Sequence, residues 1–255
     1  MPENESSSTL WRTILGVRFF AGPADEAVRL GLAGGLVVVP AAPALVNLGT
    51  DAEYTRALTT ADLALTDSGL MVMLWNLLER DRVIRTSGLE YLVLMLKNPG
   101  FEQGRGTVWI MPGETACAKA CTWLASQGIA IARDDCYLAP IYGPGRIDDP
   151  ALARFLENKK PRQVVVALGG GTQERLGLFI RENVATATGI HCIGAALGFL
   201  SGDQVRIPMW ADALVLGWLF RCLSAPGKFL PRYLVALRLI PLMIKQRHAS
   251  CSGGL

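Results

Sequence analysis

Short runs of branched apolar residues alternate along the chain with longer segments of helical period. The short runs predict strands at Thr13–Phe19, Leu36–Val39, Leu63–Thr66, Val108–Met111, Cys136–Ile141, Val164–Leu168 and Ile190–Ile193. The longer segments predict helices at Pro23–Leu32, Ala44–Thr60, Leu70–Leu78, Leu89–Leu96, Thr115–Ser126 and Pro150–Asn158. Strands with so few polar residues are typical of a sheet that is covered on both faces. The pattern therefore predicts an α/β fold with a mostly parallel sheet and helices on both faces.

The pattern changes after Gly202, where basic residues are interleaved with aromatic and aliphatic ones. We call residues 204–250 the C-terminal appendage and expect it to be helical and basic. Helices of this composition suit the headgroup region of an anionic membrane. The alternative is an amphipathic helix pair that packs on the sheet, and composition alone leaves both open.

The ends and the uncharged stretches of the chain set the expected domain organisation. Residues 1–10 are polar and predict a disordered tail, which leaves residues 11–203 for the α/β domain. The uncharged stretches 30–50 and 183–202 are broken by glycine, proline or polar residues, so we expect no transmembrane helix. No basic segment followed by an apolar one opens the chain, which favours a cytoplasmic protein.

Charge and cysteine content exclude some functions. A net charge of +3 and the lack of a known nucleic-acid motif argue against nucleic acid as a partner. The six cysteines lack the paired spacing of a zinc site, so no metal is expected, and Cys117 and Cys121 are interpreted as packing residues on a helix. His191 precedes an apolar run and is interpreted as a strand-end residue with its hydrogen bonds satisfied.

Three short motifs lie where an apolar run gives way to a turn or helix, the position at which open α/β sheets bind ligands. They are Asp67-Ser68-Gly69, Arg85-Thr86-Ser87-Gly88 and Gly169-Gly170-Gly171-Thr172-Gln173-Glu174. Asp67 is placed to act as a general base, although it is equally suited to cap the following helix. Ser68 lacks the flanking residues of a nucleophile elbow. Together the motifs favour transfer chemistry at a phosphorylated substrate.

The second and third motifs suit phosphate groups. The planar guanidinium of Arg85 fits phosphate, and the glycine turn that follows lets the backbone approach an anion. The glycines at 169–171 precede a helix, whose free N–H groups could bind a diphosphate. They match neither a dinucleotide fingerprint nor a P-loop, so the glycine run alone is a weak signal.

In order and spacing, these segments resemble the WecG/TagA/CpsF family of bacterial glycosyltransferases, from about residue 15 to about residue 233. The resemblance rests on five segments, which are Ala61-Asp62-Leu63 through Gly69, Arg85 to Gly88, Ala167 to Glu174, Arg206-Ile207-Pro208 and Trp218-Leu219-Phe220-Arg221. It implies a Rossmann-like fold and a metal-independent, inverting transfer without a cofactor. The sugar would pass from a UDP-sugar or other nucleotide sugar to a polyprenyl-pyrophosphate-linked sugar, in cell-envelope or exopolysaccharide synthesis.

The resemblance also implies roles for individual residues. Asp67 matches the proposed base, and Arg85 matches a second residue of the catalytic site. Donor binding is expected at Gly169, Gly170, Gly171, Gln173 and Glu174. Phosphate or membrane contacts are expected in the C-terminal appendage at Arg206, Arg221, Lys228 and Arg232. The protein would then work at the inner face of the cell membrane as a peripheral protein, with a homo-oligomer left open.

Several positions depart from the family pattern. Val39 and Ala41 replace the polar residues of its Thr-x-Asn, Gly171 and Thr172 replace proline and lysine, and Gly198 stands where aspartate is usual. These departures motivate an alternative, a non-catalytic homologue that binds a nucleotide sugar. An unrelated dinucleotide-dependent oxidoreductase is disfavoured because the glycine fingerprint is missing.

Overall fold

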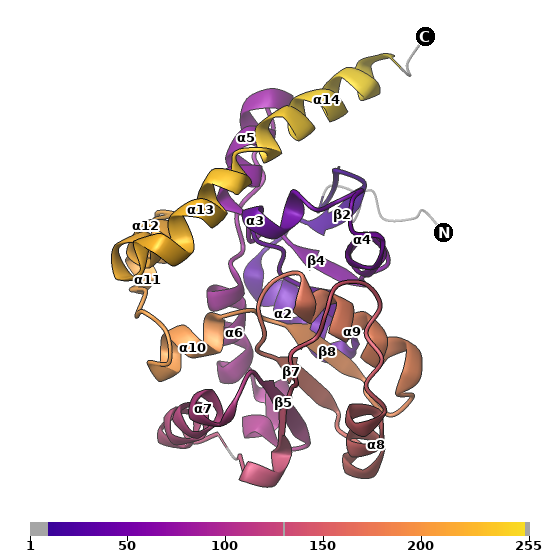
Figure 1. Ribbon diagram of the computed structural model, residues 1–255, viewed down its shortest axis with the longest axis vertical. Helices are drawn as coiled ribbons and strands as arrows, with labels where there is room; N and C mark the ends of the chain where they lie inside the picture. The colour runs from indigo at the N-terminus through magenta and orange to yellow at the C-terminus, as the bar shows by residue number, and fades with distance from the viewer. Residues whose placement is uncertain (1–9, 130, 253–255) are drawn as a thin grey trace.

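The computed structural model describes residues 10–129 and 131–252, and its centre is a sheet of eight strands (Figure 1). The strands are β1 (Trp11–Ile14), β2 (Val17–Phe20), β3 (Gly35–Val38), β4 (Leu63–Leu65), β5 (Thr107–Met111), β6 (Cys136–Leu138), β7 (Gln163–Val166) and β8 (Gly189–Cys192). They lie in the order β1-β2-β4-β3-β8-β7-β5-β6. Only β1 and β2 pair antiparallel. The predicted Rossmann-like α/β fold is confirmed; the predicted tail at residues 1–10 lies almost entirely outside the described residues.

Helices cover both faces of the sheet. One face packs against α3 (Ala42–Leu45), α4 (Ala52–Thr59), α5 (Gly69–Glu79), α8 (Pro150–Lys159) and α9 (Thr172–Asn183). The other packs against α2 (Ala24–Ala33), α6 (Gly88–Lys97), α7 (Glu114–Ser126) and α10 (Ala196–Ser201). Short 3₁₀ helices, η1 (Pro99–Gly104) and η2 (Arg133–Asp135), complete the connections. Strand residues alternate between the two cores, as the pleat requires: Leu36 and Val38 face one, Val37 and Val39 the other.

Three predicted elements are wrong in their boundaries. The expected strand Cys136–Ile141 ends at Leu138, shortly before Pro140, which has no backbone N–H to donate to a ladder. The expected strand Thr13–Phe19 is a hairpin, because Leu15 and Gly16 take φ values of 53° and 78° between the paired residues Ile14 and Val17. Two positive φ values in a two-residue loop are typical of a type I′ turn. The expected helix Ala44–Thr60 is two helices, because Asp51 caps a new one by accepting a hydrogen bond from the Tyr54 N–H at 2.9 Å.

The C-terminal appendage contains α11 (Met209–Ala213), α12 (Gly217–Ser224) and α13 (Pro226–Ala236), and most of α14 (Leu239–Ser252). Figure 1 shows α13 and α14 in gold and yellow, with α13 beside α3 and α14 beside α5. Leu239 and Met243 of α14 are buried in the core that α5 shares. No helix among the described residues has the length and apolar character needed to span a membrane.

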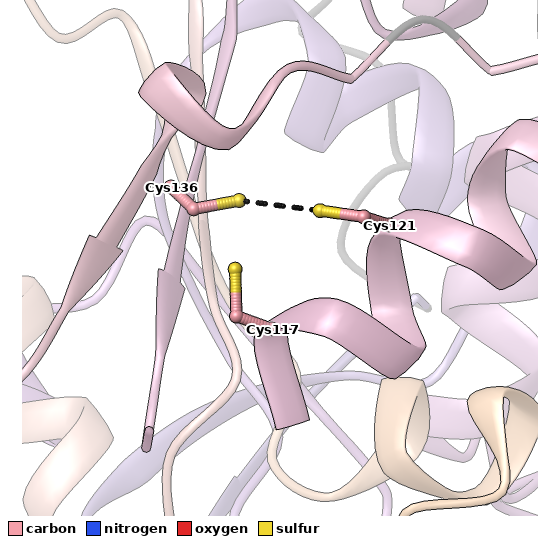
Figure 2. A group of neighbouring side chains, drawn as sticks. All are labelled: Cys117, Cys121 and Cys136. Atoms are coloured by element: carbon pink, nitrogen blue, oxygen red, sulfur yellow. Dashed lines mark hydrogen bonds between the residues drawn. The ribbon is translucent and has the colours of Figure 1, made fainter. Parts of the chain in front are cut away.

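The cysteines of α7 pack inward, as predicted, and they also meet a third cysteine. Cys117 is fully buried in the core beneath α7, and Cys121 is half-buried one turn later. Both face Cys136 at the start of β6 (Figure 2). The sequence spacing of these three residues did not predict that they would meet.

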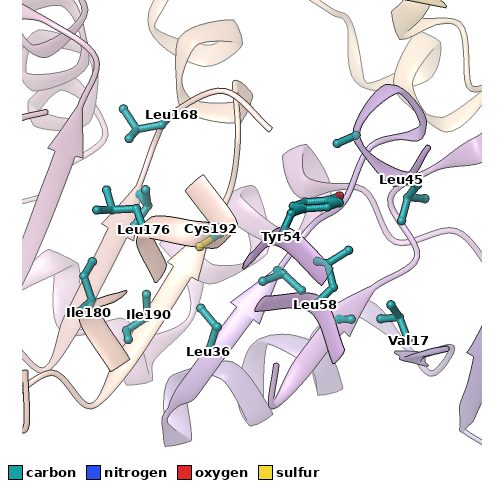
Figure 3. Packing of buried hydrophobic residues seen from close by; sticks show 14 of the residues in the cluster. Val17, Leu36, Leu45, Tyr54, Leu58, Leu168, Leu176, Ile180, Ile190 and Cys192 are labelled. Atoms are coloured by element: carbon teal, nitrogen blue, oxygen red, sulfur yellow. The ribbon is translucent and has the colours of Figure 1, made fainter. Parts of the chain in front are cut away.

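The core beneath α4 and α9 encloses one unpaired polar atom. Figure 3 shows Tyr54 of α4 among aliphatic side chains that include Leu36, Leu58 and Leu176. The Tyr54 side chain is fully buried, and its hydroxyl has no hydrogen-bond partner among the described residues. Burial raises the pKa of Tyr54, and the nearby charge of Glu174 raises it further.

A buried polar chain crosses the other core. Tyr91 Oη lies 2.8 Å from His191 Nδ1, and His191 Nε2 lies 2.7 Å from Gln163 Oε1. Because an amide oxygen only accepts, Nε2 carries the proton and Nδ1 accepts from the tyrosine hydroxyl. His191 therefore has both hydrogen bonds satisfied, as predicted. Burial lowers the pKa of His191 to about 4, so the ring is neutral at pH 7.

We predict that His191 makes the protein less stable in mild acid. The pKa of histidine in the unfolded chain is about 6.5. Below that pH the unfolded state binds a proton, whereas native His191 stays neutral until the pH approaches 4. Stability should fall by roughly 3 kcal/mol as pH drops from 6.5 to 4, with no contribution above pH 6.5. Urea unfolding of the wild type and His191→Gln across this range isolates the effect, because their difference removes shared titrations. A difference that is constant with pH would contradict the prediction.

Candidate functional site

Two of the three motifs singled out in the sequence lie at the carboxyl ends of parallel strands, whereas Arg85-Thr86-Ser87-Gly88 lies between α5 and α6 and is joined to Asp67 by the Gly88 N–H. Asp67 follows β4, the glycines at 169–171 follow β7, and Gly194 follows β8. These strands pair in parallel, directly or through β3, so their carboxyl ends meet at one edge of the sheet. Residues more than 100 positions apart in the chain are therefore brought to the same edge.

Asp67 is held at this edge by its neighbours but keeps one oxygen available. Its Oδ1 accepts a hydrogen bond from the Gly88 N–H at 2.9 Å and lies 3.7 Å from Nη2 of Arg85. Its Oδ2 has no hydrogen-bond partner within residues 10–129 and 131–252. Ser68 caps α5 by accepting from the Met71 N–H at 3.2 Å, so the helix does not need Asp67 as a cap.

The surroundings of Asp67 favour its protonated form. Burial raises the pKa of Asp67 above its usual value, and the nearby charge of Asp212 adds to the rise. Arg85, the Gly88 N–H and Arg221 act in the opposite direction on the same pKa. A raised pKa makes the carboxylate a stronger base than an exposed aspartate.

Arg85 joins the turn after β4 to the C-terminal appendage. Its Nε donates to the Asp67 carbonyl at 2.7 Å, and its Nη1 donates to the Asp212 carbonyl at 2.7 Å. Its Nη2 donates to Oδ1 of Asp212 at 3.1 Å. Every nitrogen of this guanidinium therefore has a protein acceptor. Arg85 lies beside Asp67, as predicted, but it is engaged with the protein.

Asp212 of α11 is a residue that the sequence interpretation missed. Besides pairing with Arg85, it accepts a hydrogen bond from the hydroxyl of Ser87, which itself caps α6. Asp212 is thus bonded to the second motif and, through Arg85, to the first. The one available signal was that Asp212 is the only acidic residue in the basic segment 204–250.

A second contact fixes the C-terminal appendage against the first motif. A Cβ atom on Gly69 would lie only 2.1 Å from Cγ1 of Val215, so only glycine leaves room here. Val215 has a φ of 60°, which is rare and costly for a β-branched residue. Strain of this kind persists only where the surrounding contacts hold it. Here the strained residue, Val215, packs on Gly69, where the C-terminal appendage docks beside Asp67.

Gln173 and Glu174 tie the turns after β7 and β8 together. Oε2 of Glu174 accepts from the Gly171 N–H at 2.6 Å, and Oε1 of Gln173 accepts from the Gly194 N–H at 2.6 Å. The two side chains bond each other at 3.0 Å and are buried. Burial raises the pKa of Glu174 to about 7, with a contribution from the charge of Asp67.

The glycine turn itself is open to solvent and needs its glycines. Gly169 and Gly170 are exposed, and Gly171 has a φ of 90°, which side chains rarely adopt. Gly171 is the N-cap residue of α9.

Arg175, also missed from the sequence, connects this turn to the loop after β6. It donates to the carbonyls of Gly171 at 3.2 Å, Gly143 at 2.8 Å and Gly145. The loop lines an open cavity of about 610 Å³, whose lining includes Tyr142, Arg146 and Arg154. Gly143, whose carbonyl accepts from Arg175, also lines this cavity, so Arg175 links the cavity wall to the glycine turn.

Of the four basic residues predicted in the C-terminal appendage, Arg221 is near Asp67. The charge of Arg221 lowers the pKa of Asp67, its guanidinium lies 4.6 Å from the ring centre of Phe199, and its Nη1 donates to Tyr233 at 3.3 Å. Its Nε is buried and has no hydrogen-bond partner in the described part of the chain. The other three, Arg206, Lys228 and Arg232, are exposed, and none of the described contacts joins them to Asp67.

Val39, one of the departures from the family pattern, packs against Gly88, whose N–H positions Asp67. A Cβ atom on Gly88, which donates to Asp67, would lie 3.1 Å from Cγ2 of Val39. Val39 is buried, so this position contributes packing where the pattern has a polar side chain. Ala41 precedes α3 without a side-chain cap.

Comparison with known proteins agrees with this arrangement. The sequence model of the family described as "Glycosyl transferase WecG/TagA/CpsF family" matches residues 12–251, which is nearly the whole chain. A search of curated proteins found no significant match. The match begins within β1 and spans the other seven strands of the described sheet, the edge that holds Asp67 and the C-terminal appendage with Asp212. The chain therefore belongs to the WecG/TagA/CpsF family of glycosyltransferases, whose members act in cell-envelope polymer synthesis.

Proposed function

We propose that the protein transfers a sugar from a nucleotide-diphosphate sugar to a sugar carried on a polyprenyl pyrophosphate, with inversion at the anomeric carbon. The observation that carries this proposal is the carboxylate of Asp67, which has a raised pKa and one oxygen without a hydrogen-bond partner among the described residues. It lies at the edge of the sheet that also bears the glycine turn. Family membership makes sugar transfer the reaction to which this base belongs.

The proposed chemistry is a single displacement. Oδ2 of Asp67 takes the proton of the acceptor hydroxyl while the oxygen of that hydroxyl forms a bond to the anomeric carbon. The bond from that carbon to the donor diphosphate breaks on the opposite face, and the nucleoside diphosphate leaves with the electron pair. General-base catalysis of this kind typically contributes about 10² to 10⁴ in rate.

The leaving diphosphate needs positive partners, and Arg221 is the best placed. Its Nε–H is buried and has no hydrogen-bond partner in the part of the chain that the structure describes, and its charge lowers the pKa of Asp67. Arg85 is instead proposed to position Asp67, because its donors are bonded to Asp67 and Asp212. Guanidinium groups are suited to neutralise diphosphate oxygens, which is the basis for proposing a reaction that needs no metal.

We further propose that the C-terminal appendage binds the inner face of the cell membrane, where a polyprenyl acceptor would be anchored. Large apolar side chains stand exposed on it, among them Trp210, Trp218 and Leu234 at 59%, 46% and 59%. Exposed Lys228 and Arg232 lie on α13 between such residues. Basic and aromatic side chains on one surface are typical of proteins that bind anionic headgroups.

We predict that reversing two of these charges weakens membrane binding. Each basic side chain near an anionic surface contributes about 1 kcal/mol, so Lys228→Glu with Arg232→Glu should weaken binding at least roughly 30-fold. Sedimentation with phosphatidylglycerol vesicles measures this. The matched control is Lys97→Glu with Arg105→Glu, which makes the same change in net charge outside the C-terminal appendage. Lys97 is the last residue of α6, and Arg105 follows η1. Equal loss in both proteins would mean that only net charge matters.

A panel of UDP-, GDP- and dTDP-sugars tests the proposed reaction. A true donor should raise the Tm by binding the native state, and should yield product with a short-chain polyprenyl-pyrophosphate-linked sugar. Turnover should persist in a chelator. Stabilisation without product would instead identify the non-catalytic homologue that Val39 and Ala41 motivate. Loss of turnover in the chelator would refute metal independence.

A further inference from the structure

Three thiols converge on one point away from the candidate site. Cys117 and Cys121 are four residues apart and so lie on one face of α7, and Cys136 is the first residue of β6. Their three Sγ atoms all lie within 4.8 Å of one another, and those of Cys121 and Cys136 are 3.8 Å apart (Figure 2). The free thiols thus form a cluster that the proposed reaction does not use.

The spacing of the sulfur atoms matches that of metal-bound thiolates. A tetrahedral zinc ion with Zn–S bonds of about 2.3 Å separates its sulfur ligands by about 3.8 Å. The separation of Cys121 and Cys136 equals this value, and the third sulfur lies within 4.8 Å of both. We propose that Cys117, Cys121 and Cys136 form a binding site for a thiophilic metal ion, with Zn²⁺ as the ion to test.

The charges around the cluster are compatible with such an ion. Binding would displace one proton from each of the three thiols, which leaves a complex of three thiolates and one Zn²⁺ with a net charge of −1. Nη1 of Arg133 donates to the carbonyl of Cys136 at 3.2 Å. Burial raises the pKa of Cys117, and the positive charge of Arg133 acts in the opposite direction. Arg133 is also paired with Glu114, so less of its positive charge is available to balance the negative charge of the metal complex. Arg133 therefore offsets part of the negative charge.

The ligand set favours a soft ion with an open fourth position. Among the described residues, no histidine, aspartate, glutamate or further cysteine joins the group of three. Thiolates select Zn²⁺ and Cu⁺ over hard ions such as Mg²⁺ and Ca²⁺. Cys121 is half-buried, so water could reach the fourth position from its side.

The ion would fasten the edge of the sheet. β6 is the outermost strand beside β5 and has only three residues. A metal bound by α7 and β6 would close the chain between residues 117 and 136 and hold this short edge strand in place. Since binding to the native state stabilises it, the effect should appear in thermal unfolding.

Zinc binding to the full-length, reduced protein tests the proposal. Equilibrium dialysis followed by metal analysis should find one Zn²⁺ per chain, and a hundredfold excess over Kd should raise Tm by about 5 to 10 °C. Cd²⁺ should give a thiolate-to-metal absorption band in the ultraviolet. Cys121→Ser should weaken binding by at least about a hundredfold, because losing a ligand exceeds the cost of losing an outer partner. Cys222→Ser, at a free cysteine of α12, is the matched control and should bind normally.

Cys121→Ala, with a better helix former at the same position, serves if the serine variant does not fold. Zinc binding that is unchanged in either folded Cys121 variant, or lost equally in Cys222→Ser, would overturn the proposal. A Cys121–Cys136 disulfide that forms under a mild oxidant, in a protein that binds no zinc when reduced, would identify a redox pair instead of a metal site.

Discussion

Asp67→Asn is expected to lower kcat by at least roughly 10² while the fold is retained. The amide oxygen can still accept the hydrogen bond from the Gly88 N–H, so the turn stays in place. The second oxygen becomes an NH₂ group, which cannot take a proton from the acceptor. The variant therefore removes the proposed base and leaves the local geometry unchanged. Steady-state kinetics with donor and acceptor measure the loss of turnover.

The pH dependence of this reaction gives an independent readout. Since burial raises the pKa of Asp67, kcat/KM of the wild type should fall as pH drops through a value above the usual aspartate range. This acid limb should be missing from the residual activity of Asp67→Asn.

Asp62→Asn is the matched control, because that carboxylate also accepts a backbone hydrogen bond, from Leu36 at 2.7 Å, just before the same strand. It should turn over normally. Turnover of Asp67→Asn within about threefold of the wild type, where general-base loss predicts far more, would mean that Asp67 only positions other groups.

Asp212→Ala is expected to release the C-terminal appendage from the α/β domain. The change removes the carboxylate bonded to Arg85 and Ser87 and leaves the largely buried Arg85 without its nearest ion-pair partner. Removing one partner of a buried pair costs 3–5 kcal/mol; because Asp212 and Arg85 keep 12% and 18% side-chain exposure, we expect about 2–3 kcal/mol. The lost free energy should weaken the docking of the C-terminal appendage, while the cores on the two faces of the sheet remain intact.

Hydrogen exchange locates the effect. Amides of residues 204–224 and of the turns at residues 67–69 and 85–88 should exchange faster in Asp212→Ala, while those of β7 and β8 keep their protection. Turnover should fall more than tenfold, because Arg85 no longer positions Asp67. Asp203→Asn is the control, since it breaks an exposed pair with Lys119 that contributes little. Uniformly faster exchange throughout the sheet would point to global destabilisation instead.

The sequence predicted the strands and helices of the sheet domain well where their apolar pattern was long. β5, β7 and β8, with α6, α7 and α8, fall within one or two residues of their expected ends. Prediction failed where the local backbone conformation determines the structure. Leu15 and Gly16 both adopt left-handed conformations, and the turn they form divides one expected strand into the two strands of a hairpin. The sequence pattern does not reveal this turn, because one of the two turn residues is Leu15, and leucine rarely adopts a positive φ.

Within the candidate site, residue type, sequence position and the family resemblance were enough to propose Asp67, Arg85, Gln173 and Glu174 as site residues. They were not enough to assign partners. That Arg85 is bonded to Asp212, and that Arg175 holds the loop after β6, follows from packing between distant segments. These contacts carry no local pattern, because each depends on how helices dock after the sheet has formed.

The sequence by itself determined the α/β class, the family and the carboxylate on which the proposed chemistry rests, because apolar periodicity and short motifs are local properties. Only the tertiary structure decided which groups surround that carboxylate and where three cysteines meet. Arg85 and Asp212 are 127 residues apart, and Cys121 and Cys136 belong to a helix and a strand of different segments. Contacts of this kind arise from the burial of apolar faces against one another, which fixes polar neighbours that no spacing along the chain predicts.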